Sequence, residues 1–253
     1  MLAEDHLTKS DNVNAGAAPL DARGFPILMY HHVSHAPPRG TKSRYMFVSP
    51  SRFRSQMRAL KLLGYVGCSM ADLGDYLTGR KKGRAVGITF DDGYRNVFTD
   101  ALPVLEEFGF TSTTYFVSGQ IDGFNAWNVG RMPHAPCMSR SELRQWADRG
   151  QEVGAHTVDH ARLGTLEEGE ARRQIADSKR QLEDMTGRAV SAFSYPFGSL
   201  NDRVVEVVRE SGFASATTTV SARATGSEDP MRLPRFTVRR TDWLPGFFWK
   251  RIL

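Results

Sequence analysis

Short apolar runs alternate with amphipathic stretches along most of the chain. Apolar runs of about four to eight residues between turn residues are typical of buried strands, and the longer stretches have helical spacing. The predicted strands are Pro26–Tyr30, Tyr65–Ser69, Ala85–Phe90, Ser112–Val117, Glu152–Ala155, Ala189–Tyr195 and Ala214–Thr218. The predicted helices are Ser51–Leu63, Ala71–Leu77, Val97–Phe108, Ser139–Arg149, Leu166–Thr186 and Asp202–Ser211. Alternating strands and helices favour an α/β fold with a parallel sheet, and their number points to a barrel.

The chain divides into one large domain and two terminal segments. Its 253 residues suit a single α/β domain, which we expect over residues 25–240. Residues 1–24 are polar, lack periodicity and predict a flexible arm. Residues 241–253 interleave aromatic and basic side chains, which is typical of a peripheral membrane contact; packing against the domain is the alternative.

Charge and cysteine content narrow the choice of partners. A formal charge of +5 favours anionic partners such as phosphorylated glycans, anionic lipids or nucleic acid. The basic residues are spread along the chain without an RNA-binding signature, so solubility explains them more simply and we expect no nucleic acid. The two cysteines, Cys68 and Cys137, are too few for a disulfide scaffold. The N-terminus lacks the apolar core of a signal peptide, so we expect a cytoplasmic protein.

Two adjacent carboxylates follow the predicted strand Ala85–Phe90, in Asp91-Asp92-Gly93. Like charges this close to a core repel, and both stay ionised only where a cation compensates them. A metal ion is the simple explanation. A turn with an aspartate helix cap is about as good an explanation of this motif taken alone.

A second strand, Glu152–Ala155, ends in His156-Thr157-Val158-Asp159-His160. A spacing of four on a helical turn brings both imidazoles to one side, where they can bind one ion. Together with a carboxylate this favours a ligand set of two histidines and one aspartate with open positions, as in hydrolytic sites. The other aspartate is then free to act as a general base, and the spacing does not say which aspartate does which.

Two more predicted strands end in candidate site residues. Ala192-Phe193-Ser194-Tyr195 runs into Pro196-Phe197-Gly198, which either ends the strand or offers a backbone N–H to an oxyanion. Ile27-Leu28-Met29-Tyr30 ends in His31-His32. The carboxyl ends of barrel strands are where such folds carry their active sites.

These motifs resemble those of the polysaccharide deacetylase family, also called the NodB-homology domain or carbohydrate esterase family 4. The stretch from Thr89 to Gly93 matches the first family motif, which implies that Asp91 is the catalytic base and Asp92 a metal ligand. The His-Thr-x-x-His stretch matches the second motif and implies that its two histidines, His156 and His160, complete the metal site.

The third family motif is similar to Tyr195-Pro196-Phe197-Gly198. The resemblance implies that the Tyr195 N–H helps to hold the oxyanion, and we place Pro196 and Phe197 among the substrate-binding candidates. The resemblance spans residues 25 to 240 and implies a distorted (β/α)7 barrel of the NodB-homology type.

The chain departs from the commonest family pattern at two points. Ser194 replaces the arginine that usually orients the base, and the tail lacks the usual Leu-x-His that supplies the general acid. Tyr30-His31-His32-Val33 instead resembles the Tyr-His-x-Val signature of the poly-N-acetylglucosamine deacetylase branch. We therefore expect His31 to be the general acid, with His32 the poorer candidate.

Three further residues complete the substrate-site candidates. Arg235 either takes the orienting role of the missing arginine or is a solvated arginine on a terminal strand. The long loop after Val117 carries Asn125 and Trp127. Trp127 offers an aromatic face to a sugar ring, and packing in the core is its competing use.

The expected protein is a metal-dependent hydrolase that removes N-acetyl groups from N-acetylhexosamine units of an exopolysaccharide or envelope glycan. One divalent ion is expected, Zn²⁺ by ligand type, with Co²⁺, Ni²⁺ or Fe²⁺ compatible with the same ligands. One alternative is a deacetylase or amidohydrolase of a small non-sugar amide, which a closed pocket would favour over an open groove. The other is an inactive carbohydrate-binding protein, which would require a missing ligand or base.

Overall fold

The computed structural model describes residues 24–247 and 251–252, so the arm predicted over residues 1–24 lies almost entirely outside the described residues. The main sheet is parallel, with the order β10-β1-β5-β6-β7-β8-β9 and β4 paired to β5. All seven predicted strands are confirmed. The bounds are β1 Ile27–Tyr30, β4 Val66–Cys68, β5 Ala85–Phe90, β6 Thr113–Phe116, β7 Glu152–Ala155, β8 Ala192–Ser194, β9 Ser215–Thr217 and β10 Phe236–Thr237. A second small sheet joins β2 His32–Val33 to β3 Phe47–Val48.

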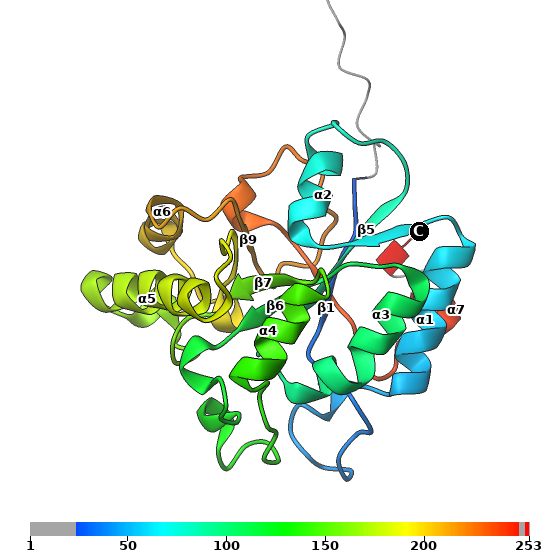
Figure 1. Cartoon of the computed structure of the whole chain (residues 1–253), viewed down its shortest axis with the longest axis horizontal. Helices are drawn as coiled ribbons and strands as arrows, with labels where there is room; N and C mark the ends of the chain where they lie inside the picture. Colours follow the sequence, from blue (N-terminus) through cyan, green and yellow to red (C-terminus); the bar gives the residue numbers. More distant parts are fainter. Residues whose placement is uncertain (1–23, 248–250, 253) are drawn as a thin grey trace, which may run out of the picture.

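Helices surround the curled sheet on its outer side (Figure 1). All six predicted helices are present, although the one predicted over Val97–Phe108 opens with a π-helical turn, Val97–Ala101. Ser139 caps its helix through a reciprocal pair of hydrogen bonds with Glu142, as a capping box does. The bounds are α1 Pro50–Leu62, α2 Met70–Leu77, α3 Leu102–Phe108, α4 Arg140–Asp148, α5 Glu168–Thr186, α6 Asp202–Glu210 and α7 Leu244–Phe247.

The strand β10 was not among the seven predicted strands, and it brings the two ends of the sheet together. Leu233 pairs with Thr217, the last residue of β9, and three residues later Phe236 and Thr237 pair with β1. The segment is too short, and too interrupted by Pro234, to produce a strand pattern in the sequence. The result is a curled parallel sheet of the predicted distorted barrel type.

One side of β5 is shared by two strands, and this arrangement distorts the barrel. The first half of β5, Ala85 to Gly87, pairs with β4, and its last residues, Thr89 and Phe90, pair with β6. On the other side β1 pairs with β5 from Gly87 to Phe90. The eight strands therefore fill only seven positions around the curl.

The tail after residue 240 packs on the domain where the structure describes it. Phe247 and Ile252 are buried, and the Tyr65 hydroxyl donates a hydrogen bond to the Ile252 carbonyl. Trp243 is exposed, with the Arg52 guanidinium 4.1 Å from its ring centre. The aromatic and basic residues 248–250 lie outside the described residues. Within the described part of the chain, no helix is long and apolar enough to cross a membrane.

Candidate metal and active site

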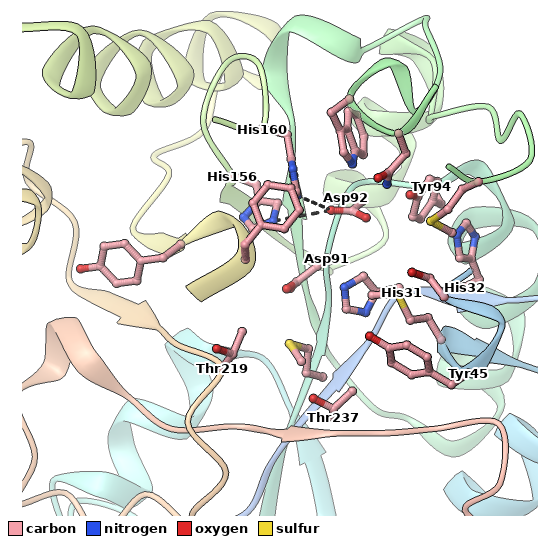
Figure 2. Close-up of a pocket in the computed structure, with 18 of the residues that line it drawn as sticks. His31, His32, Tyr45, Asp91, Asp92, Tyr94, His156, His160, Thr219 and Thr237 are labelled. Carbon is pink, nitrogen blue, oxygen red and sulfur yellow. Dashed lines mark ion pairs between the residues drawn. The ribbon is translucent and has the colours of Figure 1, made fainter. Parts of the chain in front are cut away.

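A cavity of about 430 Å³ opens at the carboxyl ends of the strands. Predicted site residues from four strand ends line it, as Figure 2 shows for the labelled histidines and aspartates. These residues are His31 after β1, Asp91 and Asp92 after β5, His156 after β7, and Tyr195 after β8. Because the strands are parallel neighbours, side chains far apart in sequence meet at one edge of the sheet.

Asp92, His156 and His160 offer one ligand atom each within 4.8 Å of one another. The Nε2 atoms of His156 and His160 lie 3.6 and 3.1 Å from Asp92 Oδ1 (Figure 2). All three side chains are buried. The structure therefore brings the predicted metal ligands together.

The segment from His156 to His160 is not a helical turn, so the predicted local geometry is wrong. Thr157 and His160 have left-handed backbones, with φ of 66° and 58°. The peptide N–H groups of Val158 and Asp159 donate to the Gln174 side chain of α5 rather than along a helix. The two histidines converge because α5 holds this loop in a tight bend.

The donor set fits a divalent cation. His156 Nδ1 lies 2.7 Å from the Ser194 carbonyl, which can only accept, so Nδ1 carries the proton and Nε2 faces Asp92 with its lone pair. Burial lowers the pKa of His156 to about 4, so the ring is neutral at pH 7. No described residue donates a hydrogen bond to the buried Asp92 Oδ1. A lone pair facing a buried carboxylate oxygen repels it unless a cation lies between them.

Asp91 is held by Arg235, which donates two parallel hydrogen bonds of 2.7 and 2.8 Å to its carboxylate. Burial raises the pKa of Asp91, but the Arg235 charge and hydrogen bonds outweigh this and hold the pKa below its ordinary value. The same guanidinium donates to the Thr89 and Ser194 hydroxyls. Asp91 is therefore an ionised base in a fixed orientation.

Two expectations for Arg235 need correction. It is fully buried inside the curl of the sheet, so it is not a solvated arginine. Its Nε also donates to the Thr218 carbonyl, and it is not among the residues that line the cavity, so it does not bind substrate. Ser194, the residue that replaces the usual arginine, accepts a hydrogen bond from Arg235. The orienting charge has moved from β8 to the segment before β10.

The two histidines after β1 have different surroundings. His31 lines the cavity beside Asp91 and Asp92 (Figure 2). His32 lies between the rings of Phe47 and Tyr94, with ring centres 4.0 and 3.8 Å away. Burial, together with the neighbouring His31, lowers the pKa of His32 to about 3. Burial lowers the pKa of His31 as well, so the direction of the shift does not separate the two rings. The aromatic stack holds His32, whereas His31 has both Asp91 and Asp92 as charged neighbours, and this favours His31 as the acid.

The loop and turn candidates divide into those that face the cavity and those that do not. Trp127 lines the cavity and stacks on His160 at 4.8 Å, and Phe197 meets the same imidazole edge-on at 4.4 Å. Asn125 is not a substrate residue, because its amide is hydrogen-bonded within the loop to Pro133 and Ala135. Pro196, also predicted to bind substrate, is buried and does not line the cavity.

Tyr195 lines the cavity, but its backbone N–H already has a partner. The group donates a long hydrogen bond of 3.3 Å to the Thr217 carbonyl in the sheet. An oxyanion would have to compete with this bond. The phenol is used structurally, since it donates to the Met231 carbonyl.

Several cavity residues lie outside the motifs and were missed. Tyr45, Tyr94, Asn128 and Arg162 line the cavity, and Thr219 and Thr237 lie below Asp91 in Figure 2. Most come from loops whose course depends on the folded domain, so no spacing rule could find them. Tyr94 stands two residues after Asp92, a closeness that could have suggested it.

Comparison with known proteins identifies the family. The model of the polysaccharide deacetylase family matches residues 78–216, more than half of the chain. This protein belongs to the polysaccharide deacetylases. A polysaccharide deacetylase structure from Bacillus cereus shares 29% identity and a TM-score of 0.76, covering 90% of this chain and 68% of that one.

Two further relatives agree with this assignment. The poly-β-1,6-N-acetyl-D-glucosamine N-deacetylase of Staphylococcus epidermidis is 24% identical over 92% of this chain and 85% of its own. The deacetylase PplD of Streptococcus pyogenes, solved with acetate, shares the fold, with a TM-score of 0.80 at 22% identity over 91% of this chain and 99% of its own. Members of this family are metalloenzymes, in keeping with the Asp-His-His cluster.

Proposed function

We propose that this deacetylase is a divalent-metal-dependent enzyme that removes N-acetyl groups from N-acetylhexosamine units of a glycan. The proposal rests on one observation, which is that the candidate base lies next to the candidate metal ligands. Asp91, ionised and held by Arg235, adjoins the buried cluster of Asp92, His156 and His160. A fixed base beside a cation site is what hydrolysis of an unactivated amide requires.

The cavity residues divide the chemistry among them. Asp92, His156 and His160 would hold a divalent cation, which would supply Lewis-acid chemistry by polarising a carbonyl and lowering the pKa of water. Asp91 accepts the proton of the attacking water at its carboxylate, whose two oxygens are oriented by Arg235. His31 donates a proton to the departing amine nitrogen, in keeping with its place beside both aspartates (Figure 2).

Zn²⁺ is the proposed ion, because two imidazole nitrogens and one carboxylate are a common zinc ligand set in hydrolases. Co²⁺, Ni²⁺ and Fe²⁺ accept the same ligands. Metal analysis of the purified protein, followed by chelation and reconstitution with each ion, would identify the one that restores activity best.

A carbohydrate substrate is supported by exposed aromatic side chains of the cavity and by a relative. Two aromatic side chains that line the cavity, Phe197 and Tyr45, are 44% and 48% exposed. Exposed aromatic faces suit the apolar faces of sugar rings. The Staphylococcus epidermidis relative is named for its action on poly-β-1,6-N-acetyl-D-glucosamine, and this supports an N-acetylhexosamine substrate.

Acetate release from N-acetylglucosamine oligomers is the direct test, run with and without a chelator. We expect release that stops on chelation, returns with Zn²⁺ and falls at least about a hundredfold in Asp91→Asn, the loss typical of a general base. His31→Ala should reduce turnover while it retains metal. Acetate release from small amides alone, with none from the oligomers, would contradict the glycan substrate.

A further inference from the structure

We infer that the glycan substrate carries anionic groups, carboxylate or phosphate, next to the acetylated sugar, and that Arg162 and Arg239 at the cavity mouth bind them. This inference rests on the proposed deacetylase function and narrows its substrate class. It starts from the distribution of charge around the cavity.

Four of the segments that contribute side chains to the cavity are rich in basic residues. Residues 39–46, 127–132, 160–162 and 237–240 each contribute cavity-lining side chains. Together they contain seven arginine or lysine residues and no aspartate or glutamate. The cations exposed to solvent are Arg39, Lys42, Arg131, Arg162 and Arg239.

None of these seven cations forms an ion pair with a described residue. Elsewhere pairing is common: on α5, Arg172, Arg173 and Lys179 all pair with acidic side chains. The carboxylates inside the cavity do not balance the mouth either, because Asp91 pairs with Arg235 and Asp92 faces the cation site. The mouth therefore carries uncompensated positive charge, which attracts anions.

Two of these cations are placed by aromatic side chains of the cavity wall. The Arg162 guanidinium lies 3.9 Å from the centre of the Phe197 ring, and Arg239 lies 5.6 Å from that of Tyr45. Phe197 packs against His160, whereas Tyr45 lies across the cavity from His160 (Figure 2). Arg162 itself lines the cavity, and Arg239 lies next to Tyr45, on the side of the cavity across from His160.

This arrangement suits a glycan better than a free anion or a flat surface. Each guanidinium stacks on an exposed ring that is itself suited to a sugar face, so neighbouring sugars and their charges meet paired surfaces. An acetyl group at the base of the cavity, near Asp92, would place the neighbouring sugars against these rims.

The test compares matched oligosaccharides with the full-length, metal-loaded protein. Acetate release is measured on a neutral N-acetylglucosamine oligomer and on oligomers of equal length that carry uronate carboxylates or phosphates. We expect kcat/KM to be about tenfold higher for an anionic oligomer than for the neutral one at low salt. This preference should shrink at about 300 mM NaCl, because salt screens exposed charges. The two anionic oligomers show which anion is preferred.

The variant pair R162Q/R239Q should bring the ratio of anionic to neutral kcat/KM close to one. R58Q is the matched control, since Arg58 is an exposed arginine of α1 that does not line the cavity. It should keep the wild-type ratio. A wild-type ratio near one, or a ratio that the double variant leaves unchanged, would overturn the inference.

Two further measurements distinguish this inference from the proposed function and from binding to a lipid surface. Absence of acetate from every oligomer would overturn the proposed function, and calorimetric binding of the same oligomers would then test the anion preference by itself. Co-sedimentation with vesicles of phosphatidylcholine, with and without phosphatidylglycerol, tests a lipid instead. If R162Q/R239Q lost vesicle binding but kept its glycan ratio, the cationic mouth would serve a membrane and the inference would fail.

Discussion

At the scale of single residues, the site depends on a buried ion pair whose partners are 144 positions apart, Asp91 and Arg235. Removing one partner of such a pair leaves an uncompensated charge in the interior. The pair therefore links the stability of the domain to the ionisation of the base.

Replacing Arg235 by Met should lower the free energy of unfolding by about 3–5 kcal/mol. It should also raise the pKa of Asp91, because burial is then no longer offset, and move the acidic limb of the kcat/KM profile to higher pH. R235K keeps the charge but not the paired hydrogen bonds, so its stability and its acidic limb should lie between those of the wild type and R235M. Denaturant unfolding and a pH–rate profile measure both effects.

R232M is the control, since Arg232 forms ion pairs at the surface that are worth about 1 kcal/mol or less. An acidic limb that stays in place in R235M would show that Arg235 does not tune the base.

His32 should make the metal-free protein less stable in mild acid. Its pKa is about 3 in the folded state and about 6.5 when unfolded, so the unfolded chain binds more protons between these values. This stabilisation is complete above pH 6.5 and is lost as the pH falls, at up to about 1.4 kcal/mol per pH unit. H32F keeps an aromatic ring between Phe47 and Tyr94 and should flatten the slope between pH 6.5 and 4.

Urea unfolding in the presence of a chelator, at half-unit steps of pH, measures this slope. Replacement of the exposed His35 by Phe is the matched control. A wild-type slope in H32F would contradict the assignment.

At the scale of elements, the metal ligands depend on tight backbone bends at strand ends. Asp92 and Gly93 both have left-handed backbones, with φ of 77° and 68°, directly after β5. A Cβ on Gly93 would lie 2.6 Å from Phe116 Cδ1. The bend that aims Asp92 at the histidines therefore requires glycine at this position.

Gly93→Ala should displace Asp92 and weaken Zn²⁺ binding by about tenfold, a loss of about 1.4 kcal/mol. Gly109→Ala is a matched control, because its φ is 65° but nothing lies within 4 Å of the added Cβ. It should lose about 1–2 kcal/mol of stability from backbone strain alone and keep its zinc affinity. Competition with a chromophoric chelator measures affinity, and equal affinities in the two variants would contradict this account.

The sequence predicted the strands and helices well because each long apolar run is complete within itself. It also predicted Asp91, Asp92, His156 and His160, since Asp91 and His156 directly follow such runs and the other two lie within four residues of Asp91 or His156. The sequence could not predict the course of the loops, since the bend at His160 depends on contacts with α5. The strand β10 was not predicted because it is only two residues long. Local patterns cannot report contacts made by distant segments, which is why Asn125 was misplaced and Tyr45 was missed.

At the scale of the whole molecule, metal binding should raise thermal stability, since the ligands come from different strand ends. Zn²⁺ at about a thousand times its Kd contributes about 4 kcal/mol, or roughly 8–16 °C in Tm for a domain of this size. D92N should show little of this shift. D148N, at a 70% exposed aspartate, should show all of it. Scanning calorimetry with and without zinc decides, and an equal shift in D92N would place the metal elsewhere.

The position of Arg235 in the sequence also affects when, during synthesis, the barrel can close. A ribosome adds about 5–20 residues per second, so Asp91 is synthesised roughly 7–30 s before the arginine that neutralises it. Until then the interior of the sheet would hold an unpaired carboxylate, which opposes closure of the barrel. A nascent chain halted before residue 235 should therefore neither close its core nor cleave amides. Catalysis would begin only once the segment that completes the sheet has emerged.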